Sequence, residues 1–123
     1  FSVWCIMGSP LMLGCDIRSM DEETLKLITN KELIRINQDP ECRQAFRLSQ
    51  SWDKDGVVLA RKLENGDFAI GIFNFNDYRA MLPVYFEDIG YPADCGLKFE
   101  VHNVLTGEKF TCVDWSKNNV RLL

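Results

Sequence analysis

The fold is decided by residues 57–75, VVLARKLENGDFAIGIFNF, in which two apolar segments flank a short polar turn. Asn65 and Gly66 tolerate the positive φ of a tight hairpin turn, so we predict that Val57–Leu63 pairs antiparallel with Phe68–Phe75. The second segment is apolar on both faces, which is typical of a central strand. This stretch therefore predicts an antiparallel sheet.

Shorter strands are predicted on the C-terminal side of the hairpin. Tyr78–Phe86 is apolar enough for a strand, and Pro83 within it indicates an edge position or a bulge. Apolar and polar residues alternate from Leu97 to His102, as expected of a strand with one solvent-facing side. The remaining predicted strands are Lys109–Val113 and Val120–Leu123. About six to eight short strands with frequent turns predict an antiparallel β-sandwich.

The N-terminal part of the chain has a different pattern. Phe1–Gly8 is predicted to be the end of a buried helix, and Leu11–Ile17 a short strand with apolar residues on both faces, as in a covered parallel sheet. Ser19 or Asp21 can cap the helix that follows, and Asn30 is predicted to divide it into two short helices. Helix–strand–helix is too short to close a sheet, so we interpret this part as the remnant of an α/β domain.

The joint between the two parts is predicted at residues 37–40, Asn-Gln-Asp-Pro. Polar side chains there can satisfy exposed backbone groups, and the proline stops the helix. Residues 1–40 and 41–123 are the two units that we expect on either side of it.

The composition suits a folded domain that does not bind nucleic acid. The 123 residues are 46% hydrophobic and 26% charged, which is enough apolar material for a core. The formal net charge is −4, and no basic cluster forms the footprint that nucleic acid requires. Residues 1–15 carry no charge, but this run is shorter than the roughly 20 residues of a membrane helix. We therefore expect neither a nucleic-acid nor a membrane partner.

The cysteines give a first indication of compartment. They are Cys5, Cys15, Cys42, Cys95 and Cys112. An odd number at wide spacing argues against a disulfide scaffold, and a single histidine, His102, argues against a closed zinc site. The residues alone favour buried free thiols in a reducing compartment such as the cytoplasm, without metal or cofactor.

Two blocks in the N-terminal part carry a family resemblance. The first is WCIMGSPLMLGCDIR at residues 4–18, and the second is TNKELI at residues 29–34 followed by INQDP at residues 36–40. Together they resemble the α-galactosidases of glycoside hydrolase family 27. In that family the first block forms the last strand of a (β/α)8 barrel, and the second ends the barrel and leads into a C-terminal antiparallel β-domain.

The resemblance extends more loosely over the rest of the chain. It rests there on LARKLENGDFAI at residues 59–70 and VLTGE at residues 104–108. It implies that residues 1–40 are the C-terminal end of a truncated (β/α)8 catalytic barrel and that residues 41–123 are the β-sandwich domain.

An activity also follows from the resemblance. Members of this family release terminal α-linked galactose from oligosaccharides with retention at the anomeric carbon, which needs two carboxyl groups about 5 Å apart. In the family both catalytic aspartates lie on earlier barrel strands, so we expect them to precede Phe1. The chain then holds no catalytic residue and is expected to be inactive alone, while its β-domain supports the barrel of the parent enzyme.

A stand-alone carbohydrate-binding or structural β-sandwich module is the alternative to an enzyme fragment. A flat aromatic face can stack on a sugar ring, although a core role explains most of the aromatic residues better. The aromatic side chains considered for such a platform are Trp52, Phe73, Phe75, Tyr78, Tyr85, Phe86, Tyr91 and Trp115.

Asp16 and Arg18 are the site candidates, because they lie at the C-terminal end of the predicted barrel strand, where active sites of such barrels are built. They either support the substrate-facing loops through charged hydrogen bonds or form an ion pair that ends the strand and caps the next helix. In neither interpretation is Asp16 the nucleophile. His102 is expected to be solvated or satisfied within the core.

Two further expectations concern compartment and self-association. Many family members are secreted or lysosomal, which opposes the cytoplasmic interpretation of the cysteines. The apolar segment Phe1–Ile17 is expected to lack the barrel neighbours for which it is built. We therefore expect it either to pack onto the sandwich in a non-native way or to be buried against a second copy of the chain.

Overall fold

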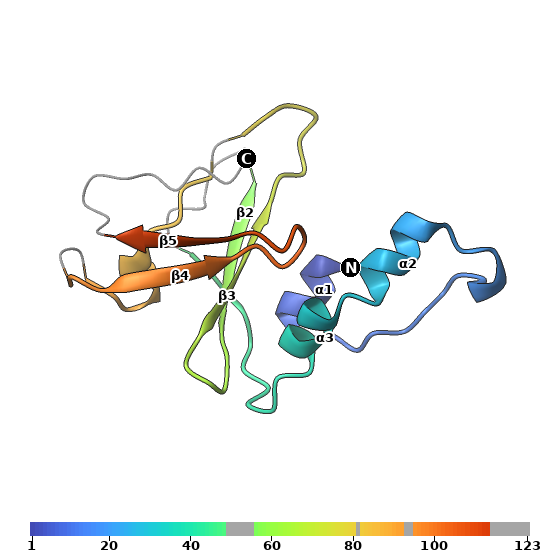
Figure 1. Ribbon diagram of the computed structural model, residues 1–123, viewed down its shortest axis with the longest axis horizontal. Coiled ribbons are helices and arrows are strands. Elements are labelled where there is room, and N and C mark those ends of the chain that lie inside the picture. The colour runs from blue at the N-terminus through green and yellow to red at the C-terminus, as the bar shows by residue number, and fades with distance from the viewer. Residues whose placement is uncertain (49–55, 81, 93–94, 114–123) are drawn as a thin grey trace.

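The computed structural model describes residues 1–48, 56–80, 82–92 and 95–113. Within these ranges, three α-helices gathered on one side of the molecule precede two antiparallel sheets (Figure 1). The elements are α1 (Ser2–Met7), the 3₁₀ helix η1 (Ile17–Ser19), α2 (Glu22–Ile28), α3 (Lys31–Asn37), β1 (Phe46–Arg47), β2 (Val57–Lys62), β3 (Phe68–Phe73), the 3₁₀ helix η2 (Phe86–Ile89), β4 (Lys98–His102) and β5 (Lys109–Val113).

Capping side chains set where α2 and α3 begin. The Asp21 carboxylate accepts a hydrogen bond of 2.7 Å from the backbone N–H of Thr24 and starts α2. The Asn30 side-chain oxygen accepts bonds from the N–H groups of Glu32 and Leu33, 3.0 and 3.1 Å long, and starts α3. The predicted division of this region at Asn30 into two short helices is confirmed.

The first sheet has the strand order β1-β2-β3 and is antiparallel throughout. Val57 pairs with Phe73 and Lys62 with Phe68, so the predicted hairpin is confirmed. Gly66 has a φ of +90° in its turn, a conformation that glycine adopts without strain. Among the described strands β2, not β3, is central.

Two apolar clusters cover the two faces of this sheet, which explains why β3 is apolar on both faces without being central. The helix-side core consists of Ile6, Ile36, Leu63 and Ala69, with Ala45, Leu59, Phe73 and Val104 packed against it. The opposite core consists of Leu48, Val58 and Ala60, with Ile70, Ile72, Leu82, Val84 and Ile89 packed against it. The alternation of side chains along each strand assigns them to these two faces.

The second sheet pairs β4 with β5, with His102 opposite Lys109. It runs across β2 and β3 in Figure 1. Phe99 of β4 lies 4.4 Å from Phe86 and 5.0 Å from Tyr91 between ring centroids, and Tyr91 in turn contacts Phe68 of β3. Aromatic side chains therefore join the two sheets, and the predicted mainly-β sandwich is confirmed.

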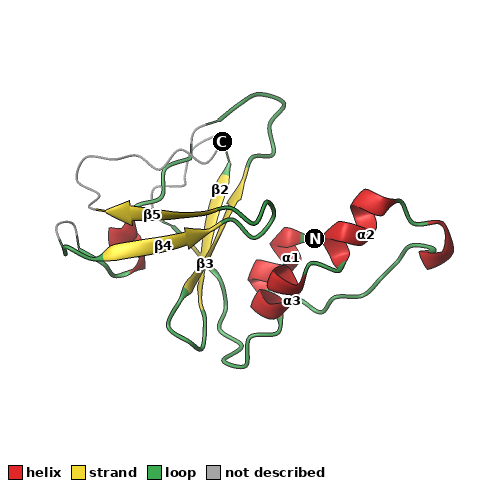
Figure 2. Cartoon of the chain, in the orientation of Figure 1, coloured by secondary structure: helices red, strands yellow, loops and turns green. Residues whose placement is uncertain are grey.

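Leu11–Ile17 does not form the predicted strand. The chain between α1 and α2 is a loop apart from η1 (Figure 2). A strand needs a hydrogen-bonded neighbour for its backbone, and no strand among the described residues lies beside this segment. Met12 and Leu13 are accordingly exposed. The expected helix–strand–helix unit is thus a helix–loop–helix unit here.

The strand predicted over Tyr78–Phe86 is also wrong in the described residues. Asn74 folds the chain into a turn instead: its Nδ2 donates to the Tyr78 carbonyl over 2.7 Å, and its Oδ1 accepts from the Asn76 N–H. Asn and Asp side chains compete with strand pairing in this way, and Pro83 has no N–H to donate to a neighbouring strand. Val120–Leu123 lies outside the described residues.

Candidate functional site

Asp16 and Arg18 form an ion pair whose hydrogen bonds all lie within residues 16–18. Arg18 Nε donates to Asp16 Oδ1 over 2.9 Å, and Arg18 Nη2 donates to Asp16 Oδ2 over 2.8 Å. The backbone N–H of Arg18 also donates to Asp16 Oδ1, so the carboxylate caps η1. Both side chains are exposed, with 86% of Arg18 and 47% of Asp16 accessible to solvent.

The electrostatics of this pair follow from those bonds. Hydrogen bonding to the Arg18 guanidinium, and secondly to its backbone N–H, lowers the pKa of Asp16 below its ordinary 3.8. Bonding to Asp16 raises the pKa of Arg18 in the same way. Asp16 is therefore an anion held by a cation, which suits a cap and does not suit a proton donor.

A second polar group occupies the predicted joint at residues 37–40. Asn37 is buried, and its Nδ2 donates to the carbonyl oxygens of Ser9 and Trp4 over 2.8 and 3.3 Å. Asp39 is also buried, and its two carboxylate oxygens accept from the backbone N–H groups of Glu41 and Glu64. Polar side chains thus satisfy the backbone at this joint, as the sequence predicted.

Other side-chain hydrogen bonds cross between the helical part and the strand-containing part. Glu64 lies in the β2–β3 turn, so Asp39 ties the end of the helical part to the hairpin over 3.0 Å. Asn30 makes another crossing bond, because its Nδ2 donates to the Val104 carbonyl in the β4–β5 turn over 2.9 Å. One side chain therefore caps α3 and contacts the second sheet.

Arg61 is the feature that sequence reasoning missed. It lies on β2 with only 1% of its surface exposed, and its Nη1 donates to the Cys5 carbonyl over 3.3 Å. Alternation along β2 puts Arg61 on the same face as Leu59 and Leu63, which pack against the helices. A cation flanked by two leucines on one strand face was the signal that could have identified it.

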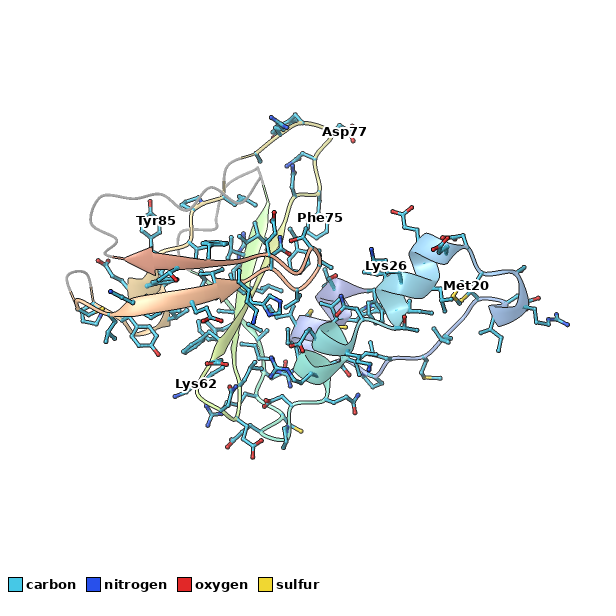
Figure 3. The ribbon with its side chains drawn as sticks, in the orientation of Figure 1. Met20, Lys26, Lys62, Phe75, Asp77 and Tyr85 are labelled. Carbon is cyan, nitrogen blue, oxygen red and sulfur yellow. The ribbon has the colours of Figure 1, made fainter. Side chains whose placement is uncertain are left out.

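The described aromatic side chains proposed as a sugar platform do not form one common face, although Phe73 and Phe75 stack with ring centroids 6.2 Å apart. Phe73 packs in the helix-side core, whereas Phe86 and Tyr91 contact Phe99 between the sheets. Exposed aromatic rings are Phe75, Tyr78 and Tyr85. Figure 3 places Phe75 and Tyr85 well apart on the strand-containing part of the molecule. Trp52 and Trp115 lie outside the described residues.

The cysteines and His102 add no reactive cluster to the described part of the chain. Cys5 is buried, and burial raises the pKa of its thiol. Cys15 and Cys42 are exposed, so the expectation of buried thiols is wrong at these two positions, which lie in loops rather than in the core. His102 is exposed on β4, as expected of a solvated histidine.

Across residues 1–48, 56–80, 82–92 and 95–113, no three His, Cys, Asp or Glu side chains gather in a way that could hold a metal ion. None of the helices in the described ranges has the length and apolar character needed to cross a bilayer.

Comparison with known proteins matches both parts of the chain. Residues 53–122 match the family model described as the alpha galactosidase C-terminal beta sandwich domain, and residues 1–39 match the model described as alpha galactosidase A. The α-galactosidase of Coffea arabica is 36% identical over 93 residues, which are 76% of this chain and 24% of that protein. Alpha-galactosidase 3 of Arabidopsis thaliana is 44% identical over 91 residues, 73% of this chain and 21% of that protein.

A solved structure gives the same result at the level of the fold. The crystal structure of α-galactosidase I from Mortierella vinacea superposes with a TM-score of 0.82 and 25% sequence identity, over 92% of this chain and 29% of that one. The chain thus spans about a fifth to a quarter of the length of the curated relatives named above.

Proposed function

This chain belongs to the α-galactosidase family of glycoside hydrolases, and we propose that it is the C-terminal part of a retaining enzyme that removes terminal α-linked galactose from oligosaccharides. The observation that carries the proposal is the order of the two family matches, alpha galactosidase A at residues 1–39 and the C-terminal beta sandwich domain at residues 53–122. The share of each relative that the chain covers agrees with a C-terminal part of a longer enzyme.

The two carboxyl groups that retaining hydrolysis requires are assigned to residues outside this chain. The reaction needs a nucleophilic carboxylate and an acid/base carboxyl group about 5 Å apart on either side of the glycosidic bond. Carboxyl groups of this kind come from the ends of several different strands of a (β/α)8 barrel. We therefore assign them to earlier barrel strands of the longer enzyme and expect the 123 residues alone to be inactive.

The role assigned to the strand-containing part is support of the barrel. The domain division proposed is residues 1–40 as the end of the barrel and residues 41–123 as the β-domain. Two bonds between these parts favour a fixed support: Asp39 accepts from the Glu64 N–H, and Asn30 donates to the Val104 carbonyl. A buried or partly buried bond resists rotation of one part against the other more than an exposed one does.

For Asp16 and Arg18 the contacts favour the structural interpretation. Their hydrogen bonds are made to each other and to the η1 backbone. We propose that the pair ends the barrel-type segment and caps the turn after it, without serving as nucleophile or acid. A contact with substrate-facing loops would have to be made by the exposed side of the Arg18 guanidinium.

The compartment proposed is the secretory pathway or the lysosome. Family resemblance supports it. The opposing argument for the cytoplasm came from the odd number and wide spacing of the cysteines. Finding the longer protein retained in the cytoplasm on cell fractionation would contradict this proposal.

The test compares the 123-residue chain with a longer chain that supplies the barrel. Hydrolysis of an aryl α-galactoside is expected from the longer chain only, with the first product retaining the α-configuration by NMR. Turnover by the 123 residues alone would contradict the assignment of the catalytic carboxyl groups. A longer chain without activity, combined with saturable quenching of tryptophan fluorescence by galactose or melibiose in the short chain, would favour a binding module instead.

A further inference from the structure

The end of α1 is held by side chains from two other elements. The Trp4 carbonyl accepts from the Ser9 N–H within the helix cap and also from Asn37 of α3. The Cys5 carbonyl accepts from the Gly8 N–H and also from Arg61 of β2. Each of these two carbonyls therefore accepts a second hydrogen bond, from a side chain of another element, in addition to its bond within the helix cap.

Arg61 suits this position by charge and by shape. The C-terminal end of a helix carries partial negative charge, which favours a cation beside it. Gly8 leaves room for the guanidinium: a Cβ at Gly8 would lie 3.0 Å from Arg61 Nη1 and 3.2 Å from its Cζ. The guanidinium therefore lies against the backbone of the turn that ends α1.

The same residue is a poor choice for stability alone. Its Nε is buried and has no hydrogen-bond partner within the described part of the chain, and none of the ion pairs found there includes Arg61. Burial of a charge with an unmade hydrogen bond costs free energy that an apolar side chain of similar size would avoid. The guanidinium instead provides a hydrogen bond of defined direction from β2 to the turn that ends α1.

We propose that Arg61 is a positioning residue, which fixes the Gly8–Ser9 turn from the sheet and so sets the direction in which residues 9–18 leave α1. The local part of this inference concerns only the 123 residues. Its catalytic consequence rests on the proposed function: the family resemblance implies that residues 9–18 form the last barrel strand of the longer enzyme, and a loosened turn would misplace the end of that strand, where active sites of such barrels are built.

The first test measures hydrogen exchange in the 123-residue chain. Arg61→Met removes the charge and the bond but keeps the volume. The amides of Gly8 and Ser9 are expected to exchange about tenfold faster, because each reports the turn that Arg61 holds. The melting temperature is expected to change by no more than about 5 °C, because the loss of the bond is offset by removal of a buried charge.

The matched control is Lys62→Met, the same chemical change one residue further along β2. Lys62 is exposed and projects away from the helices in Figure 3. Lys62→Met should leave the hydrogen exchange of the Gly8 and Ser9 amides unchanged. Arg61→Lys, which keeps the charge and one donor, is expected to restore part of the protection.

Two outcomes would overturn the inference. One is unchanged exchange at Gly8 and Ser9 in Arg61→Met. The other is faster exchange at these amides together with those of the β2–β3 hairpin and a large fall in melting temperature, which would give Arg61 a merely structural role.

The catalytic consequence is tested in the longer enzyme. Arg61→Met is expected to lower kcat for an aryl α-galactoside by about tenfold with little change in KM, whereas Lys62→Met keeps both values. Equal kinetics in the two variants would refute the catalytic consequence. An inactive unsubstituted enzyme would instead refute the proposed function, and hydrogen exchange would still decide the local inference.

Discussion

Gly8 has both a backbone conformation and a neighbour that exclude other residues. Its φ is +67°, and a Cβ there would meet the Arg61 guanidinium at 3.0 Å. We expect Gly8→Ala to lower the free energy of unfolding by about 1 kcal/mol or more, because alanine is strained at this φ and the guanidinium must move. Urea unfolding followed by circular dichroism measures the change.

Gly14→Ala is the control for that substitution. A Cβ at Gly14 would meet no atom within 4 Å, and its φ lies outside the left-handed region. Its free energy of unfolding should change by less than about 0.5 kcal/mol. Similar losses in Gly8→Ala and Gly14→Ala would contradict the role given to the α1 turn.

Asp16 and Arg18 lead to a prediction that can be tested without an activity assay. The guanidinium lowers the pKa of Asp16 below 3.8, so Arg18→Ala is expected to raise that pKa back toward 3.8. An NMR pH titration of the Asp16 side chain measures it. Asp21 is the internal control, because bonds from Thr24 lower its pKa and Arg18 takes no part in them. A shift at both residues would contradict a local pair.

The sign of the pH dependence follows from the lowered pKa. A carboxylate whose pKa is lower in the folded state stabilises that state above its unfolded value of about 3.8. The contribution is lost as the pH falls through the lower folded value. Because both side chains are exposed, salt should weaken the effect.

Single residues differed in how well sequence could identify their roles. Asp21 and Asn30 were predictable, since a cap acts within three residues of itself. Arg61 was not predicted, because its burial depends on α1, which lies more than fifty positions earlier in the chain. Its place between two leucines on one strand face becomes informative only when the covering helix is known.

At the level of elements, Asn30 connects helix start and sheet. Asn30→Ala removes the α3 cap and the bond to the Val104 carbonyl, and is expected to cost about 2 kcal/mol of unfolding free energy. Asn30→Ser keeps a capping oxygen but cannot reach Val104, so about half of that loss is expected. Urea unfolding measures both. Equal losses in the two variants would show that the cap has no separate value.

Elements with local signals were predicted well, and those that need distant partners were not. The β2–β3 hairpin carries its turn and both strands within residues 57–75, and the two strands pair antiparallel as predicted. Leu11–Ile17 requires neighbouring strands, and Tyr78–Phe86 is turned aside by Asn74 and Pro83. Apolar character alone predicted strands at both places, because hydrophobicity does not show whether a hydrogen-bonding neighbour exists.

At the level of the whole molecule, the exposed apolar side chains of the N-terminal part predict self-association. Trp4, Met12, Leu13 and Ile17 are 54%, 82%, 60% and 69% exposed. We expect the 123-residue chain to show a mass above its 14.2 kDa in sedimentation equilibrium, because soluble monomers avoid such surfaces. The double variant Met12→Lys/Leu13→Lys is expected to be monomeric.

Leu105→Lys is the control for the surface substitutions. Leu105 is 55% exposed in the β4–β5 turn, outside Phe1–Ile17. Its substitution adds one positive charge, as each of the two lysine substitutions does, but leaves the apolar segment unaltered. It should leave the association unchanged. A monomeric mass for the unsubstituted chain, together with full accessibility of Trp4 to a fluorescence quencher, would contradict the prediction.

The arrangement of the two parts was only partly predictable. The joint at residues 37–40 stays a prediction, and Asn37 and Asp39, which are buried there, bond to backbone groups as the sequence predicted. The expectation that Phe1–Ile17 packs onto the sandwich or against a second copy did not specify that α1 packs on β2 and β3 and covers one face of the first sheet. That contact joins the first residues to the middle of the chain, and no local pattern encodes it.

The side chains that hold segments of the helical part to one another and to the strands share one property with an evolutionary consequence. Arg61, Asn37, Asn30 and Asp39 each bond to a main-chain group of the segment they hold. Main-chain groups are nearly the same whichever amino acid is present. The side chains of the held segments can therefore change during evolution while these hydrogen bonds are kept. A graft of a divergent segment should therefore dock as the original does, provided that the four donor and acceptor side chains are kept.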